Sequence, residues 1–271
     1  MGAVNFSLDV QLVSSLKKVL PLPVFFETGT FKGDTIKAMI PFFDRIITVE
    51  LSEPLWLEAS HRFSSESKVE TCHGHSPDVI VRFMPALQDA SVLYWLDAHW
   101  CVADDTSGEK SQCPLLEEIQ AIGSLNENSV IIVDDARLFL APPPAPHEVS
   151  QWPSFDKIIT ELRRLSNVHE LMVINDVIVF YPGSINKQIT DYARAVGVDW
   201  LRASQSLTEN AELRGALEEK EAEIDQKEAE IHRKHDALML LTHSIEEKES
   251  VIQELSRVVQ ALRSQEKGHR S

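Results

Sequence analysis

The fold of this chain is decided by FFETGTFKGDT, residues 25–35. A hydrophobic run ends at Glu27, glycines follow at Gly29 and Gly33, and Thr35 leads into a segment with helical periodicity. This order predicts an α/β domain, because glycine permits a tight strand-to-helix turn and lets a ligand approach the backbone. The stretch lacks the GxGxxG spacing of dinucleotide-binding turns and the GK[ST] of phosphate-binding loops. The acidic Glu27 also favours a neutral or cationic ligand over a pyrophosphate.

Short apolar runs alternate with helical patterns along the rest of this region. The expected strands are 24–27, 45–49, 68–72, 91–96 and 129–133, and the expected helices lie near 33–40, 54–63, 77–84, 114–123 and 154–165. This alternation predicts a parallel sheet with right-handed crossovers. Residues 169–182 then place two apolar runs around Asn175-Asp176, which predicts an antiparallel hairpin at the end of the sheet.

A length of 271 residues allows one α/β domain with an appendage. We predict an N-terminal helix within 1–21, the α/β domain over 22–183, a helical linker over 184–208 and a long helical segment over 209–265. Prolines interrupt the loop 136–153, which is either a stiff connector or a lid over the strand ends.

Apolar residues recur every seven positions in the C-terminal segment. They are Leu217, Ile224, Ile231, Leu238, Ile245, Ile252 and Val259. The second core position holds Lys220, Lys227 and Lys234 at first, and later Leu241, Leu255 and Leu262. This period predicts an intermolecular coiled coil of two or three copies, because a helix without a partner would leave the apolar row in water. A solvated single helix is the alternative.

Charge and composition exclude several classes of protein. The formal net charge of −16 disfavours nucleic acid as a partner. No apolar run approaches the ~20 residues that span a bilayer, and no signal peptide is visible. Three cysteines do not make a disulfide framework. We therefore expect a soluble cytoplasmic protein, with any assembly at the inner face of a membrane made through a partner.

Polar side chains follow the second and third expected strands. Glu50 ends the second strand, where an acid can accept hydrogen bonds from ribose hydroxyls or simply be a polar strand end. Gly74, His75 and Ser76 follow the third strand. Ser76 is suited to shape a ligand pocket, to cap the next helix, or to do both. Because ligands of open α/β sheets bind at the carboxyl ends of strands, these residues should converge.

Three carboxylates, Asp97, Asp134 and Asp135, follow the fourth and fifth strands. Clustered carboxylates are costly unless something neutralises them, and hard oxygen ligands suit Mg²⁺ or Mn²⁺. The alternative is that Asp135 caps a helix while Asp97 is merely solvated. We expect His99 to be a base or a group behind the base, with a metal ligand or a packed residue as alternatives. A zinc site in the loop 99–113 is not supported by its spacing, so this polar loop is expected to select the substrate.

Together these motifs resemble class I S-adenosylmethionine-dependent methyltransferases over residues 22–182. Within that group they are similar to metal-dependent O-methyltransferases, both the catechol O-methyltransferase type and its sugar-methylating relatives. The motifs that carry the resemblance are ETGTFKG (27–33), Glu50, GHSPD (74–78), WLDAHW (95–100) and the pair Asp134-Asp135. The resemblance implies a Rossmann-like sheet of seven strands, mostly parallel, that ends in an antiparallel hairpin.

The resemblance also implies roles for individual residues. The cofactor S-adenosylmethionine would be bound by Glu27, Gly29, Thr30, Gly33, Glu50, Gly74, His75, Ser76 and Asp97. One Mg²⁺ or Mn²⁺ would be held by Asp97, Asp134 and Asp135. Three departures bear on the chemistry: Ala98 is inserted before His99, Cys101 replaces the family's lysine, and Asp135 replaces its asparagine. The base is then His99, Lys110 or the acceptor oxygen itself where it lies on the metal.

The function that the resemblance implies is metal-assisted O-methylation. The acidic loop and the absence of an obvious aromatic channel favour a sugar hydroxyl of a glycan or polysaccharide, and the coiled coil would suit an enzyme that caps a growing chain. One alternative is a catechol-like, small-molecule O-methyltransferase. Another is a coiled-coil assembly protein with a non-catalytic domain. The string Asp97-Ala98-His99 also suggests a metal hydrolase, but a second ligand set of that kind is missing.

Overall fold

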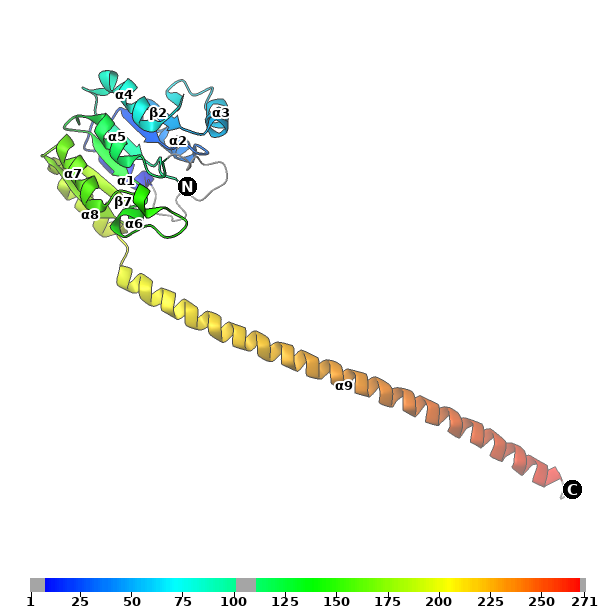
Figure 1. The fold of residues 1–271 in the computed structure, drawn as a ribbon. Coiled ribbons are helices and arrows are strands. Elements are labelled where there is room, and N and C mark those ends of the chain that lie inside the picture. Colours follow the sequence, from blue (N-terminus) through cyan, green and yellow to red (C-terminus); the bar gives the residue numbers. More distant parts are fainter. Residues whose placement is uncertain (1–7, 101–110, 269–271) are drawn as a thin grey trace. The chain divides into compact units, whose positions relative to one another are not determined.

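The computed structural model describes residues 8–100 and 111–268, with side chains as far as residue 260. The chain divides into two compact units whose boundary lies between Val198 and Asp199. The first unit is an α/β domain and the second is one long helix (Figure 1).

The first unit is built on a single sheet of seven strands in the order β3-β2-β1-β4-β5-β7-β6. The strands are β1 (Val24–Thr28), β2 (Arg45–Glu50), β3 (Val69–His73), β4 (Val92–Leu96), β5 (Val130–Val133), β6 (His169–Ile174) and β7 (Val177–Pro182). The first five strands pair in parallel, and β7 runs antiparallel to both β5 and β6. This Rossmann-like sheet with a terminal hairpin confirms the expected fold class.

Helices cover both faces of the sheet. They are α1 (Val10–Lys17), α2 (Asp34–Met39), α3 (Glu53–Arg62), α4 (Ser76–Leu87), α5 (Leu115–Ile122), α6 (Arg137–Leu140), α7 (Phe155–Leu165) and α8 (Asn186–Val196), with 3₁₀ turns η1 (Val149–Gln151) and η2 (Gly183–Ile185). Successive residues of a strand point to opposite faces, so Phe26 packs in the cluster with α4, α5 and α7. Phe25 packs in the cluster with α1, α2 and α8. Both faces are buried, as the apolar runs predicted (Figure 1).

The loop 136–153 contains a short helix that the sequence did not predict. The turn of α6 begins where the backbone N–H of Ala136 donates to the carbonyl of Asp176 and the N–H of Arg137 donates to the Asp176 carboxylate. Asp176 lies in the β6–β7 turn, 39 residues from Arg137 along the chain. The helix therefore begins on a cap from a distant hairpin, which no local sequence signal reveals.

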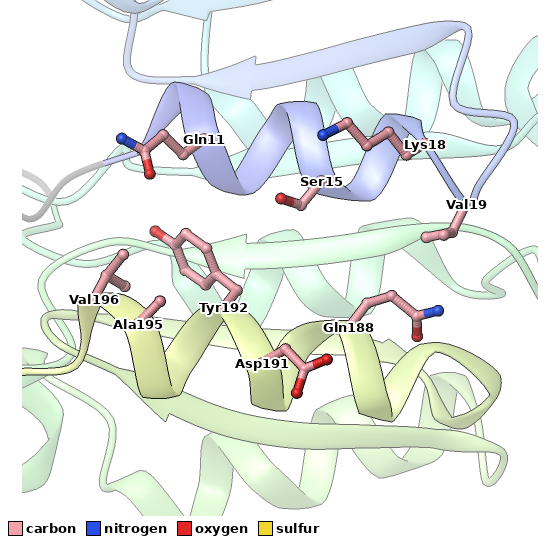
Figure 2. Close-up of a pocket in the computed structure, with 9 residues that line it drawn as sticks. All are labelled: Gln11, Ser15, Lys18, Val19, Gln188, Asp191, Tyr192, Ala195 and Val196. Carbon is pink, nitrogen blue, oxygen red and sulfur yellow. The ribbon is translucent and has the colours of Figure 1, made fainter.

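The predicted linker 184–208 contains two separate helices, α8 (Asn186–Val196) and the beginning of α9 (Trp200–Gly268). Its first part is α8, which packs on α1, and the Tyr192 hydroxyl donates to Asp9 beside that contact. A shallow groove runs between the two helices and is lined by Gln11, Ser15, Lys18, Val19, Gln188, Asp191, Tyr192, Ala195 and Val196 (Figure 2). The groove contains no candidate site residue, so the site is built elsewhere.

The second unit is α9, a helix of 69 residues from Trp200 to Gly268. Among its described side chains, the predicted seven-residue row from Leu217 to Val259 is 46–64% exposed in the single chain. Lys227 and Lys234 each form an ion pair one turn back, with Glu223 and Glu230. In the part of the chain that the structure describes, no helix is long and apolar enough to cross a membrane.

Candidate active site

The glycine turn after β1 brings its backbone against the end of β4. Gly29 has φ +83°, and a Cβ built on it would lie 2.3 Å from the carbonyl oxygen of Asp97. The N–H groups of Gly29 and Thr30 both donate to the carbonyl of Val49 on β2. Gly33, with φ +74°, begins α2 so close to Phe63 that a Cβ would lie 2.6 Å from the ring. Both glycines are therefore required by space as well as by backbone conformation.

Glu50 is fixed at the end of β2, facing the glycine turn. One carboxylate oxygen accepts from the N–H of Phe31 and the other from the N–H of Ser52, both at 2.8 Å. Phe31 has φ +46°, a conformation that a residue with a side chain adopts only when its surroundings hold it there. Each carboxylate oxygen has a further lone pair, so Glu50 can still accept hydrogen bonds from a ligand.

Glu27 lies beneath the turn and is 1% exposed. Thr48 donates to its carboxylate at 2.6 Å, and the hydroxyls of Thr48 and Thr30 lie 2.6 Å apart. Burial raises the pKa of Glu27 to about 8, with further increases from the charges of Asp97 and Glu50. Glu27 is therefore mostly protonated at neutral pH, and a cation nearby would favour its ionised form.

Ser76 faces an acid that the sequence analysis missed. Ser76 is the first residue of α4, and no side chain caps this helix at His75. The Ser76 hydroxyl instead donates to Glu118 of α5 at 2.5 Å. Glu118 is 1% exposed, and burial raises its pKa to about 7 against hydrogen bonds from Ser76 and Thr28. Its position on the buried face of α5, with Leu115 and Ile122, was the available signal.

The structure leaves one predicted cofactor residue apart from this cluster. His75 is exposed, and its ring nitrogen lies 3.8 Å from the carboxylate of Asp78. Gly74 has φ +144° and lies directly before it, where its N–H donates to the carbonyl of Glu50. The Gly74 backbone is thus tied to β2, while the His75 side chain faces its own helix.

His99 and the aspartates gather at the ends of β4 and β5. The Nε2 atom of His99 lies 2.7 Å from one oxygen of Asp135 and 3.7 Å from the carboxylate of Asp97. Burial alone would lower the pKa of His99, but the Asp135 hydrogen bond and the nearby negative charges raise it to about 9. Burial raises the pKa of Asp97 and that of Asp134, in the second case to about 6, and the two charges repel each other.

Asp135 differs from the other two aspartates because cationic groups hold both of its oxygens. Arg137 Nη1 lies 2.5 Å from the oxygen that His99 does not contact, and Arg137 also pairs with Asp176. Burial would raise the pKa of Asp135, but His99 and Arg137 together lower it to about 2. Asp135 is therefore ionised at neutral pH.

An aromatic cluster covers His99, although the sequence showed no obvious aromatic channel. The Trp152 and Phe139 rings lie edge-on to the His99 ring, with centroids 5.6 and 6.3 Å away. His147 contacts both Trp152 and Trp100. These rings come largely from the loop 136–153, so this loop forms a wall of the site.

Gln112 fastens that wall to the segment that precedes α5. Its side-chain oxygen accepts from the Trp152 indole N–H and from the N–H of Glu148. Its own N–H donates to the side chain of Gln151, and its carbonyl accepts from the N–H of Trp100. Cys101 and Lys110 of the loop 99–113 lie outside the described residues.

The fit to a metal ion is partial. Among residues 8–100 and 111–268, no group of three or more His, Cys, Asp or Glu side chains is arranged to hold one. Asp97 and Asp134 repel each other, so a cation between them would lower that cost. Asp135 does not fit this role in the observed arrangement, because His99 and Arg137 occupy its oxygens.

No protein-family model and no curated protein sequence matches the chain. The solved structures that it resembles include a candidate methyltransferase of Streptococcus mutans in complex with SAH, with 7% identity, a TM-score of 0.45 and coverage of 64% of this chain and 96% of that one. A candidate O-methyltransferase of Klebsiella pneumoniae shows 13% identity and a TM-score of 0.43, with coverage of 66% of this chain and 83% of that one. A candidate rRNA methylase of Clostridium thermocellum shows 9% identity and a TM-score of 0.46, with coverage of 64% of this chain and 95% of that one. At these identities and TM-scores the likenesses carry no argument about activity, so the fold assignment rests on the strand order and the functional argument on the site itself.

Proposed function

We propose that this chain is an S-adenosylmethionine-dependent O-methyltransferase. The observation that carries the proposal is the cluster of buried acids around a glycine turn at adjacent strand ends. Burial and mutual repulsion raise the pKa of Glu27, Asp97 and Asp134, and a cationic ligand would relieve that cost. S-adenosylmethionine carries such a positive charge on its sulfonium.

The place of the same turn supports the cofactor assignment. Gly29 lets the turn pack directly against the backbone of Asp97, because a Cβ there would lie 2.3 Å from the Asp97 carbonyl oxygen, so the turn stands beside the acids at the end of β4. Glu50 stands one strand away with its carboxylate fixed by two backbone N–H groups, in the position from which an acid accepts ribose hydroxyls. Ser76, with Glu118 behind it, would form the adenine side of the pocket.

His99 is the proposed general base. When bound, the cofactor supplies the methyl group and leaves as a neutral thioether. The acceptor hydroxyl gives its proton to His99 while its oxygen forms the new bond to carbon. Because Nε2 faces Asp135, the nitrogen that takes this proton would be Nδ1. The raised pKa of His99 favours a rate that increases with pH, since a base must first lose its proton.

A divalent cation is part of the proposal as a group that Asp97 and Asp134 would hold. Such a cation would supply Lewis acidity that lowers the pKa of the acceptor hydroxyl. Its support is the repulsion between these two carboxylates, because the charge of Asp134 raises the pKa of Asp97. None of the steps assigned above to residues of this chain requires the divalent cation.

The first test is calorimetric titration with S-adenosylmethionine, with and without Mg²⁺. We expect micromolar binding that weakens ~100-fold in Glu50→Ala, because two hydrogen bonds to a charged group are lost. The matched control is Glu58→Ala, which removes an exposed glutamate from α3. No binding by the unaltered protein would overturn the proposal. Full binding by a folded Glu50→Ala protein would overturn only the ribose assignment.

The proposed acceptor is a sugar hydroxyl of a glycan or polysaccharide, and the reaction is the methylation that would cap a growing chain. A small aromatic acceptor is the second candidate, favoured by the rings of Phe139 and Trp152 beside His99. We expect labelled methyl groups to reach oligosaccharides with terminal hydroxyls in preference to catechols. Transfer to catechols alone would replace the glycan proposal with the aromatic one.

We propose that α9 joins two or three copies and that the protein is cytoplasmic, with any membrane contact made through a partner. The support is the exposed seven-residue row of α9, which a second copy would cover. If the unaltered protein bound no cofactor, the alternative of an assembly protein with a non-catalytic domain would become the better explanation of this helix.

A further inference from the structure

We propose that Asp135 is the positioning residue for His99, and that Arg137, held by Asp176, reserves it for that role instead of metal binding. The inference rests on the proposed function, because it assigns separate roles to residues of the same proposed site. Asp97 and Asp134 would hold the proposed cation, while Asp135 would act through His99.

The contacts of Asp135 are those of a bridge between two cations. Oδ2 lies 2.7 Å from His99 Nε2, and Oδ1 lies 2.5 Å from Arg137 Nη1. His99 is 6% exposed and the Asp135 side chain 12%, so these hydrogen bonds are formed largely away from water. Charge-assisted hydrogen bonds of this kind are stronger than neutral ones and fix the geometry of both partners. A metal ion at Asp135 would have to displace one of them.

Arg137 is itself held in place by Asp176 of the β6–β7 hairpin. Asp176 is 6% exposed and sits in the β6–β7 turn. Its carboxylate accepts from both the backbone N–H and the guanidinium of Arg137, and its carbonyl accepts from the N–H of Ala136. The start of α6 and the side chain of Arg137 are thus fixed together, and Arg137 is aimed at Asp135.

The conformation of Asp135 also favours this role. Asp135 has φ +54°, a left-handed backbone that non-glycine residues rarely adopt, and its N–H donates to Asp134. Asp134 and Asp135 are adjacent in sequence, yet only Asp135 has its carboxylate directed to both His99 and Arg137. A metal ligand at this position would need only an oxygen lone pair, which an amide also offers. Accepting from His99 on one oxygen and from Arg137 on the other needs a carboxylate.

Asp135→Asn separates the two roles, because asparagine keeps a ligand oxygen but loses the charge. We expect kcat to fall roughly 100-fold, since the base is no longer oriented, while the affinity for S-adenosylmethionine stays within about threefold. We also expect Mn²⁺ binding, followed by electron paramagnetic resonance, to stay within about threefold of the unaltered protein. Activity retained within about threefold, or Mn²⁺ affinity reduced about tenfold or more, would overturn the inference.

Arg137→Met tests whether Arg137 keeps Asp135 from binding a metal ion. Removing the guanidinium frees Asp135 Oδ1, so we expect Mn²⁺ affinity to rise about tenfold and to return to its starting value in Arg137→Met/Asp135→Asn. Arg45→Met is the matched control, because Arg45 pairs with Glu70 and is 41% exposed, against 43% for Arg137. Unchanged Mn²⁺ affinity in folded Arg137→Met would contradict this role of Arg137. A protein that binds no S-adenosylmethionine would instead overturn the proposed function, and the manganese measurements would still decide whether Arg137 keeps Asp135 from binding a metal ion.

Discussion

Asp97→Asn is expected to abolish methyl transfer and, at alkaline pH, to make the cofactor-free protein more stable. Asp97 ends its strand against the glycine turn and shares the site with Asp134 and His99. Its carboxylate is the charge that would face the cofactor and the acceptor. Loss of one such group from a preorganised site commonly costs ~100-fold or more in kcat. Few single changes in this chain should have a larger effect on activity.

The stability effect has the opposite sign for an electrostatic reason. Burial and the charge of Asp134 raise the folded-state pKa of Asp97 above its ordinary value of 3.8. An acid with a raised pKa costs nothing below its ordinary pKa, and it destabilises the fold progressively as the pH rises through the folded-state pKa. Asparagine carries no charge at any pH. We therefore expect equal stabilities near pH 4 and a higher unfolding midpoint for the variant, by roughly 2–4 °C, at pH 8.

Thermal unfolding of the α/β domain, followed by tryptophan fluorescence between pH 4 and 9, measures this difference. Asp44→Asn is the control, because Asp44 is exposed and should show neither effect. An Asp97→Asn protein that is less stable than the original at pH 8 would mean that Asp97 is mainly structural. A stable variant with full activity would remove Asp97 from the catalytic machinery.

The sheet was predictable because its signals are local. Four of the five parallel strands, β1, β2, β4 and β5, are runs buried on both faces, and such a run is visible without any knowledge of its neighbours. The fifth, β3, lies at the edge of the sheet and is only partly buried, so the prediction that it is buried on both faces was wrong. The turn at Gly29 and the hairpin at Asn175-Asp176 are likewise set by residues next to one another. The seven-residue row of α9 is also a local pattern, so the helix itself was found, although its start at Trp200 was not.

The site was predictable only in part, because its decisive contacts join distant residues. Sequence spacing indicated that Asp97, Asp134 and Asp135 would meet, but it could not show that Asp135 is held by Arg137. That pairing depends on Asp176, which the fold brings from the last hairpin to the start of α6. The resemblance gave Asp97, Asp134 and Asp135 the same metal-binding role, and the contacts of Asp135 with His99 and Arg137 make that residue different.

Other features of the site were not predicted because the sequence allowed more than one role for a residue or did not show which side chains would be buried together. Ser76 was assigned a pocket role, a capping role or both, and the structure makes it the first residue of α4, hydrogen-bonded to Glu118. Glu118 was overlooked because acids in the first turns of helices are ordinary, and its burial depends on packing between α4 and α5. The wall around His99 was overlooked because Trp152 and Phe139 lie in a loop rich in proline.

Ile245→Asn is expected to dissociate the assembly that α9 forms. Ile245 belongs to the seven-residue row and is 56% exposed in the single chain, an exposure that a second helix would remove. Burying an isoleucine contributes roughly 2–3 kcal/mol in each copy, so a polar residue in every copy should weaken association by more than ~100-fold. Sedimentation at several protein concentrations would show the oligomer replaced by a monomer.

The position within the helix should matter as much as the residue type. Around Ile224 the second core position holds Lys220 and Lys227, whereas around Ile245 it holds Leu241 and Lys248, and Leu255 follows at the next such position. The apolar seam is therefore wider in the C-terminal half, and Ile224→Asn should weaken association less than Ile245→Asn. Leu240→Asn is the control, because Leu240 is 73% exposed but lies off the row and off the second core position. Equal effects of Leu240→Asn and Ile245→Asn would mean that general hydrophobicity, and not a coiled-coil seam, holds the copies together.

Removal of α9 after residue 205 gives the same argument its simplest form. The first unit ends at Val198 and has its own buried core on both faces of the sheet, so it should fold as a monomer. Methyl transfer to a small soluble acceptor should survive, because every described candidate site residue lies in that unit. Transfer along a long glycan should decrease if joined active sites act on one chain. An unchanged oligomer after this truncation would place the subunit contacts in the α/β domain and leave α9 for a different partner.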